Sequence, residues 1–163
     1  MGFVFNKTDK SKYRVYTLIA LAISISVQLL FIFNLNEPFM GNKPTFSTAV
    51  EAVVFVVAWL FYGMVMGYMK KTSFIKFISF YWGITGLIWL TATLMEPIGK
   101  WVIIVIPVLL VNLFPTYGLK YFADSHQLLY AILRVTLPWL SGTIGYLLVY
   151  LLKKIKVSML SDK

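Results

Sequence analysis

The chain has 163 residues, of which 60% are hydrophobic and only 13% are charged. A water-soluble domain normally carries about 25% charged residues, because its surface must meet water. The composition therefore excludes a soluble globular domain and indicates a protein whose solvent is the lipid bilayer. The net charge of +9 lies in short basic clusters at the ends of apolar segments, which argues against a nucleic-acid-binding face.

Four apolar segments are long enough to cross a hydrocarbon core, which takes about 20 helical residues. In chain order they are Val15–Leu35, Ala49–Met69, Phe77–Met95 and Leu128–Leu152. The first segment is not followed by a small-residue cleavage site, so we expect a retained span and not a removable signal peptide. The sequence thus predicts one all-α domain over residues 1–163, a polytopic integral membrane helical bundle without a separate soluble domain.

A fifth apolar segment, Trp101–Leu119, is ambiguous because it contains Pro107, Asn112 and Pro115. Two prolines and a central asparagine are typical of a broken segment whose backbone must be shielded by protein. Such a segment would dip into the membrane and return, or lie in the outer interface. The alternative is a fifth transmembrane helix, which would place the two termini on opposite sides.

The distribution of basic residues favours the first arrangement. With a cytoplasmic N-terminus and four spans, eleven lysine and arginine residues lie inside, and only Lys43, Lys100 and Lys120 lie outside. With five spans the ratio falls to eight against six, a weak form of the positive-inside pattern. We therefore expect four transmembrane helices plus one re-entrant or interfacial segment, with five transmembrane helices as the alternative. A composition rich in Lys, Ile, Phe and Asn, with two Arg, suggests a bacterial plasma (inner) membrane.

Small residues mark the faces on which membrane helices pack closely. The candidates for helix packing are Gly63, Gly67, Gly83, Gly86, Ser141 and Gly145. Helix–helix seams are the simplest interpretation, and a polar-lined pathway for a solute is the alternative. Aromatic residues near the predicted span ends, among them Tyr16 and Trp82, are expected to form interfacial belts.

The candidates for an intramembrane polar or ion-pair site are five residues within or beside the apolar segments: Gln28, Glu51, Glu96, Asn112 and Arg134. A charge inside the hydrocarbon costs about 2.5–3.5 kcal/mol, so it usually finds a partner or water. With four spans, Arg134 lies on the same side as both glutamates, and an ion pair with Glu51 or Glu96 becomes feasible. With five spans it lies in the opposite leaflet. The group is either structural or a binding site for an anionic headgroup, a substrate or a proton.

The sequence carries no pattern typical of an enzyme. It lacks cysteine, which excludes disulfides, thiolate catalysis and cysteine-ligated metals, and it lacks an HExxH, a GxSxG or a phosphate-binding loop. The single histidine, His126, lies beside Asp124 before the last span, and two such residues do not make a metal site. We therefore expect no catalytic residues, no metal and no cofactor.

Two functions fit these observations. The first is a small accessory, regulatory or immunity-type subunit that binds another membrane protein, or a second copy of itself, through its helices. The second is a small solute or ion transporter or channel lined by Gln28, Glu51, Asn112 and Arg134. Either protein would contact the bilayer throughout, with anionic lipids at the basic clusters.

Overall fold

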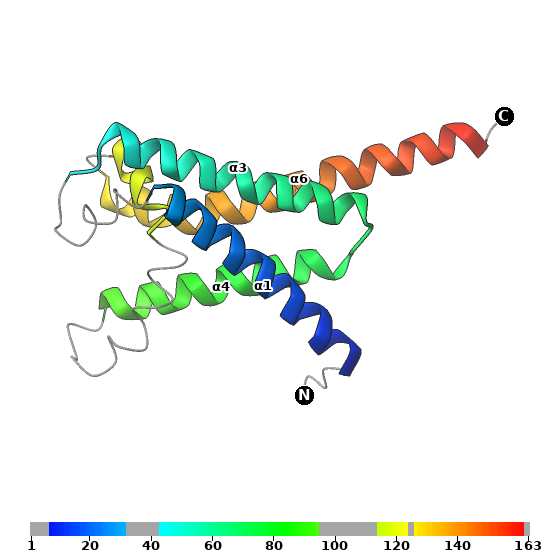
Figure 1. The fold of residues 1–163 in the computed structure, drawn as a ribbon, viewed down its shortest axis with the longest axis horizontal. Coiled ribbons are helices and arrows are strands. Elements are labelled where there is room, and N and C mark those ends of the chain that lie inside the picture. The colour runs from blue at the N-terminus through cyan, green and yellow to red at the C-terminus, as the bar shows by residue number, and fades with distance from the viewer. Residues whose placement is uncertain (1–6, 32–42, 95–113, 124–125, 162–163) are drawn as a thin grey trace.

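The computed structural model describes residues 7–31, 43–94, 114–123 and 126–161, and all of its regular elements are helical (Figure 1). The elements are α1 (Lys7–Leu30), α3 (Phe46–Tyr68), α4 (Ser73–Leu94), the short 3₁₀ helix η3 (Tyr117–Phe122) and α6 (Gln127–Ser161). Among these described helices, three are long and apolar enough to cross a membrane: α1, α3 and α6. The all-helical, membrane-type architecture expected from the sequence is confirmed to this extent. In α4, the apolar stretch Ser73–Ile88 is shorter.

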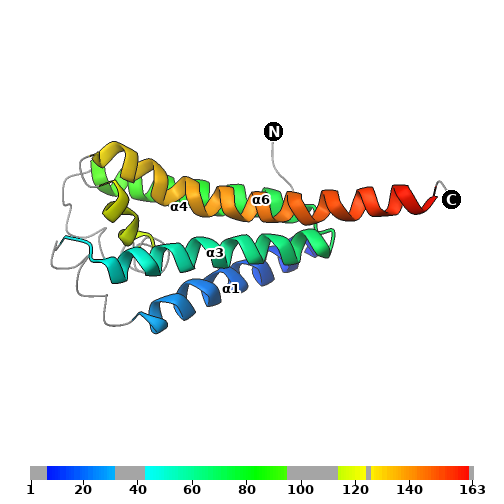
Figure 2. The ribbon, with the colours of Figure 1, turned by 90° about the horizontal axis from the view of Figure 1, so that it is seen from above.

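The helices alternate in direction (Figures 1 and 2). Helices α3 and α6 lie side by side and run in the same direction, whereas α1 and α4 run in the opposite direction. The start of α1 therefore lies beside the turn between α3 and α4, where Tyr16 and Ser73 share a hydrogen bond of 3.0 Å between their hydroxyl groups. At the same end, the Lys153 Nζ of α6 donates to the Tyr68 carbonyl at 3.2 Å.

Aromatic rings fill the space between the four long helices. Trp59 and Trp82 are fully or almost fully buried, and their ring centroids lie 5.2 Å apart in an edge-to-face arrangement, which is favourable for aromatic pairs. The buried aromatic residues of this cluster are Tyr16, Phe55, Trp59, Tyr62, Phe74, Phe77, Trp82 and Tyr146. Tyr16 and Trp82 are thus core residues, and their expected role in an interfacial belt is wrong. Distance along the chain from a span end does not show which way a side chain points.

The boundaries of the helices have local causes. Helix α3 begins after Thr45, whose side-chain oxygen accepts from the Thr48 backbone N–H at 3.4 Å. The expected segments 49–69 and 77–95 correspond to α3 and α4 within four residues at each end. Helix α1 begins eight residues before the expected span 15–35, and α6 extends nine residues beyond 128–152, because the lysine-containing flanks continue the helical backbone.

Helix α3 ends in a Schellman motif that leads directly into α4. The Lys71 backbone N–H donates to the Met66 carbonyl at 3.1 Å, and the Lys70 N–H donates to the Gly67 carbonyl at 3.0 Å. Lys70 holds the left-handed position of this motif with φ 53°. A side chain in this conformation costs about 1 kcal/mol more than glycine, which is the usual residue here.

Only the last part of the ambiguous segment 101–119 lies within the described residues, and it does not form a spanning helix. Residues 114–116 form a turn, with Pro115 and Thr116 buried, and η3 follows. Pro115 lacks a backbone N–H and therefore cannot continue a preceding α-helix undisturbed. The Gly118 backbone lies against the Thr48 carbonyl at the start of α3, so closely that a β-carbon on Gly118 would overlap it. The segment thus ends at the end of the bundle where α3 and α6 begin.

Candidate functional site

The tightest helix–helix contact joins α3 and α6 through glycine. A β-carbon on Gly63 would overlap the Gly142 carbonyl oxygen, and one on Gly67 would overlap that of Tyr146. A β-carbon on Gly145 would likewise overlap the Leu60 carbonyl oxygen. Three of the candidate packing residues, Gly63, Gly67 and Gly145, therefore lie in one seam where the two backbones touch.

Gly142 is central to the seam, although it was not among the packing residues predicted from the sequence. The predicted residue was the neighbouring Ser141, which is buried and whose hydroxyl donates to the Pro138 carbonyl at 2.9 Å within α6. The available signal was the spacing Gly142-x-x-Gly145 on the same helix. Glycine has no side chain, and so it permits a closer approach than serine.

Gly83 and Gly86 of α4 have different surroundings. A β-carbon on Gly86 would lie 3.1 Å from Val135 Cγ1, so this glycine packs against α6. Gly83 is exposed, and a β-carbon there would meet no atom of the described residues within 4 Å. Gly83 therefore does not lie in a seam between the described helices.

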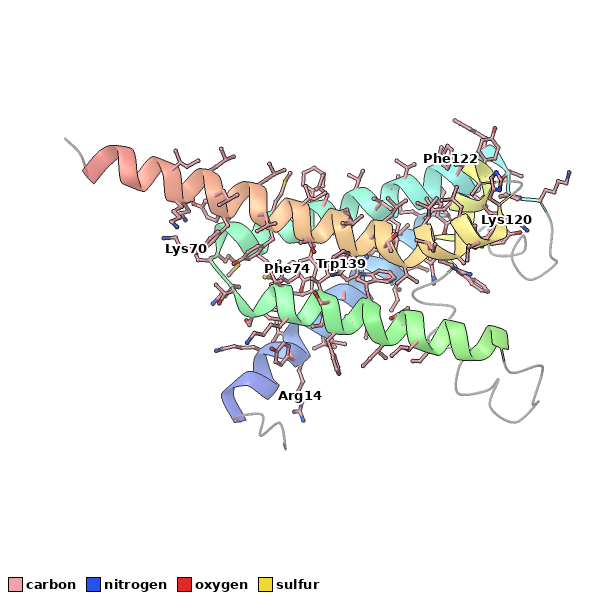
Figure 3. All side chains as sticks on the ribbon, turned by 180° about the vertical axis from the view of Figure 1, so that it is seen from behind. Arg14, Lys70, Phe74, Lys120, Phe122 and Trp139 are labelled. Atoms are coloured by element: carbon pink, nitrogen blue, oxygen red, sulfur yellow. The ribbon has the colours of Figure 1, made fainter. Side chains whose placement is uncertain are left out.

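Beside Gly83 is a hollow of about 270 Å³ between α4 and α6, which we call the α4–α6 groove. Its lining residues are Ser79, Trp82, Gly83, Val135, Thr136 and Trp139. Trp139 lies between α6 and α4 (Figure 3), and its Nε1–H donates to the Ser79 hydroxyl at 3.1 Å. The Trp82 side chain is 1% exposed, and its Nε1–H has no hydrogen-bond acceptor among the described residues. The groove thus combines small residues, an apolar wall and a buried donor.

The structure brings three of the five polar candidates to one end of the bundle. Glu51 lies on the buried face of α3 with 4% exposure, and the half-buried Arg134 lies on α6 with its Cζ 5.1 Å from the Tyr130 ring centroid. Since α3 and α6 are parallel and Gly63 lies against Gly142, Glu51 is level with Tyr130, about one helical turn (~6 Å) from Arg134 along α6. The half-buried Gln28 lies in the last turn of α1 at the same end.

The other polar residues singled out in the sequence add no further site among the described residues. Glu96 and Asn112 lie outside the described residues. His126 is exposed just before α6. No group of three or more histidine, cysteine or carboxylate residues that could hold a metal ion occurs in the part of the chain that the structure describes.

Basic residues gather at the opposite end of the bundle, which we call the basic end. It comprises the start of α1, the α3–α4 turn, the first turn of α4 and the later part of α6, and its described side chains are Lys12, Arg14, Lys70, Lys71, Lys76, Lys153 and Lys154. Figure 3 shows Arg14 and Lys70 at this end and Lys120 at the other. Lys153 also stacks on Tyr68, with Nζ 4.0 Å from the ring centroid.

Comparison of the chain with models of protein families, with curated proteins and with solved structures finds no match. Three features of the structure bear on its function: the α4–α6 groove, the closeness of Glu51 and Arg134 along the bundle, and the basic end.

Proposed function

We propose that this chain is a small non-catalytic membrane subunit, of an accessory, regulatory or immunity type, that binds a transmembrane helix of another membrane protein in the α4–α6 groove. The observation that carries the proposal is the exposed pair Ser79-x-x-x-Gly83 on α4. In lipid, helices associate through close packing at small residues, because lipid tails are as apolar as leucine. A pair of small residues four apart lets a second helix approach the backbone.

The other described glycines within α3, α4 and α6 support this interpretation by contrast. Gly63, Gly67, Gly86, Gly142 and Gly145 all meet atoms of this chain's own helices, so their small size is used internally. At Gly83 the corresponding space is open. A partner helix can fill that space in the same way as α6 fills the space beside Gly63.

The groove also offers chemistry that suits a helix. A hollow of about 270 Å³ accommodates a bulky side chain of a partner. Several exposed apolar residues beside the groove, including Phe80 and Leu87, extend the contact surface.

The packing of the bundle interior favours an accessory subunit over a solute or ion transporter. Between the four long helices, the rings of Phe55, Trp59, Phe74 and Trp82 are at most 1% exposed and pack against one another. A solute path along the bundle axis would have to displace these rings. The polar candidates Gln28, Glu51 and Arg134 lie at one end only and do not continue through this cluster.

The proposed topology has four crossings, a re-entrant or interfacial segment before η3, and both termini in the cytoplasm of a bacterial cell. The alternating helix directions support it, because a fifth crossing between α4 and α6 would make these two helices parallel. They are antiparallel: Ser79 meets Trp139, whereas Gly86 meets the earlier residue Val135. Basic side chains are concentrated at one end of the bundle, which is typical of the cytoplasmic side of a membrane protein.

Site-specific photo-crosslinking in the native membrane tests the docking proposal. A photoreactive phenylalanine analogue replaces Phe80, which is 68% exposed beside the groove, or the matched control Phe61, which is 60% exposed on α3. We expect a crosslink from position 80 to a peptide in a transmembrane helix of a different protein, and none from position 61. Equal crosslinking at both positions, or crosslinks from position 80 only to a second copy of this chain, would overturn the proposal.

A substitution that fills the α4–α6 groove provides a second test of the docking proposal. Gly83→Leu adds a side chain where the structure has open space, so the fold should persist while the position-80 crosslink and co-purification of that partner are lost. Val57→Phe, at an exposed position on α3, is the control that adds similar bulk away from the groove. Retention of the partner by Gly83→Leu would contradict docking in the groove.

A further inference from the structure

The α3–α4 turn contains a lysine where the backbone favours glycine. Lys70 is the one non-glycine residue with a positive φ among the residues that the structure describes. The Schellman motif around it is complete, so glycine would serve the turn at a lower conformational cost. A conformational cost retained at a particular residue is a reason to look for a role of its side chain.

The surroundings of Lys70 are strongly cationic. Lys70, Lys71, Lys76 and Lys154 are all exposed, and they come from the turn, from the start of α4 and from α6. The one carboxylate whose side chain the structure describes, that of Glu51, lies at the opposite end of the bundle. Mutual repulsion among these ammonium groups is relieved when an anion binds between them.

The turn also lies at the depth of lipid headgroups in the proposed topology. Helix α3 has 23 residues and is therefore about 34 Å long, which matches the thickness of a hydrocarbon core. Its last residue, Tyr68, is 64% exposed and stacks with Lys153, as expected of an aromatic side chain at the interface. Because Lys153 also donates to the Tyr68 carbonyl, it ties α6 to the end of α3 and holds Lys154 near the turn.

We propose that the α3–α4 turn binds the phosphate of an anionic phospholipid headgroup, with Lys70 and Lys71 as the principal contacts and Lys76 and Lys154 beside them. Lysine suits this role as a compact point charge that can reach a phosphate at the interface. The left-handed backbone at Lys70 sets where its side chain leaves the turn. The inference rests on the topology within the proposed function, but it is independent of docking in the α4–α6 groove.

The test uses the full chain reconstituted in vesicles of phosphatidylcholine, with or without 20% phosphatidylglycerol as the probe. We expect phosphatidylglycerol to raise the melting temperature of the wild type and to remain bound to it in native mass spectrometry. Lys70→Gln should weaken the bound phosphatidylglycerol signal by about fivefold, the effect of one lysine near an anionic surface. Lys43→Gln, the matched removal of an exposed lysine at the other end, should leave the signal unchanged.

Lys70→Gly distinguishes an effect on lipid binding from an effect on folding. It removes the positive charge, and it lowers the conformational cost of the left-handed backbone at this position. In pure phosphatidylcholine it should melt at or above the wild-type temperature, yet it should lose lipid binding as Lys70→Gln does. Equal losses in Lys70→Gln and Lys43→Gln would overturn the site, as would full retention of phosphatidylglycerol by Lys70→Gly. An equal stabilisation by millimolar inorganic phosphate in phosphatidylcholine vesicles would overturn the lipid as the ligand. Failure of lipid binding with an intact position-80 crosslink would refute this site alone.

Discussion

Gly63 of α3 and Gly142 of α6 meet backbone to backbone, with no space for a β-carbon between them. This contact and those of Gly67 and Gly145 set the register of two parallel helices that are far apart in the chain. The same register brings Glu51 and Arg134 within about one helical turn of each other along the bundle. A packing feature therefore determines which polar groups can meet.

The seam predicts a sharp difference between two glycine-to-alanine substitutions. Gly63→Ala forces the backbones apart, and overpacking of this kind typically costs about 1–3 kcal/mol of unfolding free energy. Gly83→Ala, at an open position inside α4, should not lower the unfolding free energy and should raise it by up to about 1 kcal/mol through helix propensity. Denaturant unfolding in mild detergent measures both, and equal destabilisation by the two variants would refute the seam.

Gly118 should be equally sensitive. Gly118→Ala introduces a β-carbon against the Thr48 carbonyl, so η3 must move away from the start of α3, at a cost of about 1–3 kcal/mol. The neighbouring Lys120→Ala removes a side chain at the surface of η3 and serves as the control. A melting temperature for Gly118→Ala as high as that of Lys120→Ala would show that η3 does not dock as described.

The closeness of Glu51 and Arg134 along the bundle predicts that their charges can be exchanged. Glu51→Arg and Arg134→Glu each place two like charges within about one helical turn at one end of the bundle, and breaking an ion pair that is buried costs about 3–5 kcal/mol, so each should abolish accumulation of the chain. The double variant should restore accumulation at least in part. Immunoblotting of membrane fractions measures it, and a double variant as poorly accumulated as either single one would contradict the pairing.

Lys153 and Tyr68 should be energetically coupled. A double-mutant cycle with Lys153→Met and Tyr68→Leu is expected to give a coupling free energy of about 0.5–1 kcal/mol, the range for an exposed cation–π contact. Methionine keeps the length of the lysine stem and removes the charge, so packing is largely preserved. Additive effects of the two substitutions on thermal unfolding would argue against the contact.

The helix directions predict that the two termini lie on one side of the membrane. A reporter fused after Lys163 should give the same cytoplasmic signal as one fused before Met1. A matched fusion within the loop that holds Lys43, before α3, should report the opposite side. A periplasmic signal after Lys163 would exclude four crossings, and with them the exchange of Glu51 with Arg134.

Several parts of the structure could be predicted from local sequence. An apolar segment of about 20 residues is long enough to cross the hydrocarbon core. Because no water is present there, its backbone groups must bond to one another, and a helix achieves this. The helices α1, α3 and α6 therefore follow from composition. The pair Gly63-x-x-x-Gly67 marked a packing face for the same local reason, because two small residues four apart lie on one side of a helix. The basic clusters lie at the ends of apolar segments in the sequence, and the four-span topology places most of them on one side.

Tertiary structure decided which helix each face meets, and that depends on shape across residues distant in the chain. Gly67 and Gly83 look alike in sequence, yet α6 covers the first and leaves the second beside an open groove. Tyr16 and Trp82 lie near predicted span ends, yet their rings belong to the core. Lys70 has a left-handed backbone because it lies in the turn between α3 and α4. The identity of a lysine in the sequence does not indicate its φ angle. The sequence by itself determined a helical membrane protein with basic clusters at its segment ends, because composition alone decides what can cross a bilayer. Packing determined which end gathers those clusters, and it determined the seams, the groove and the separation of Glu51 from Arg134 along the bundle.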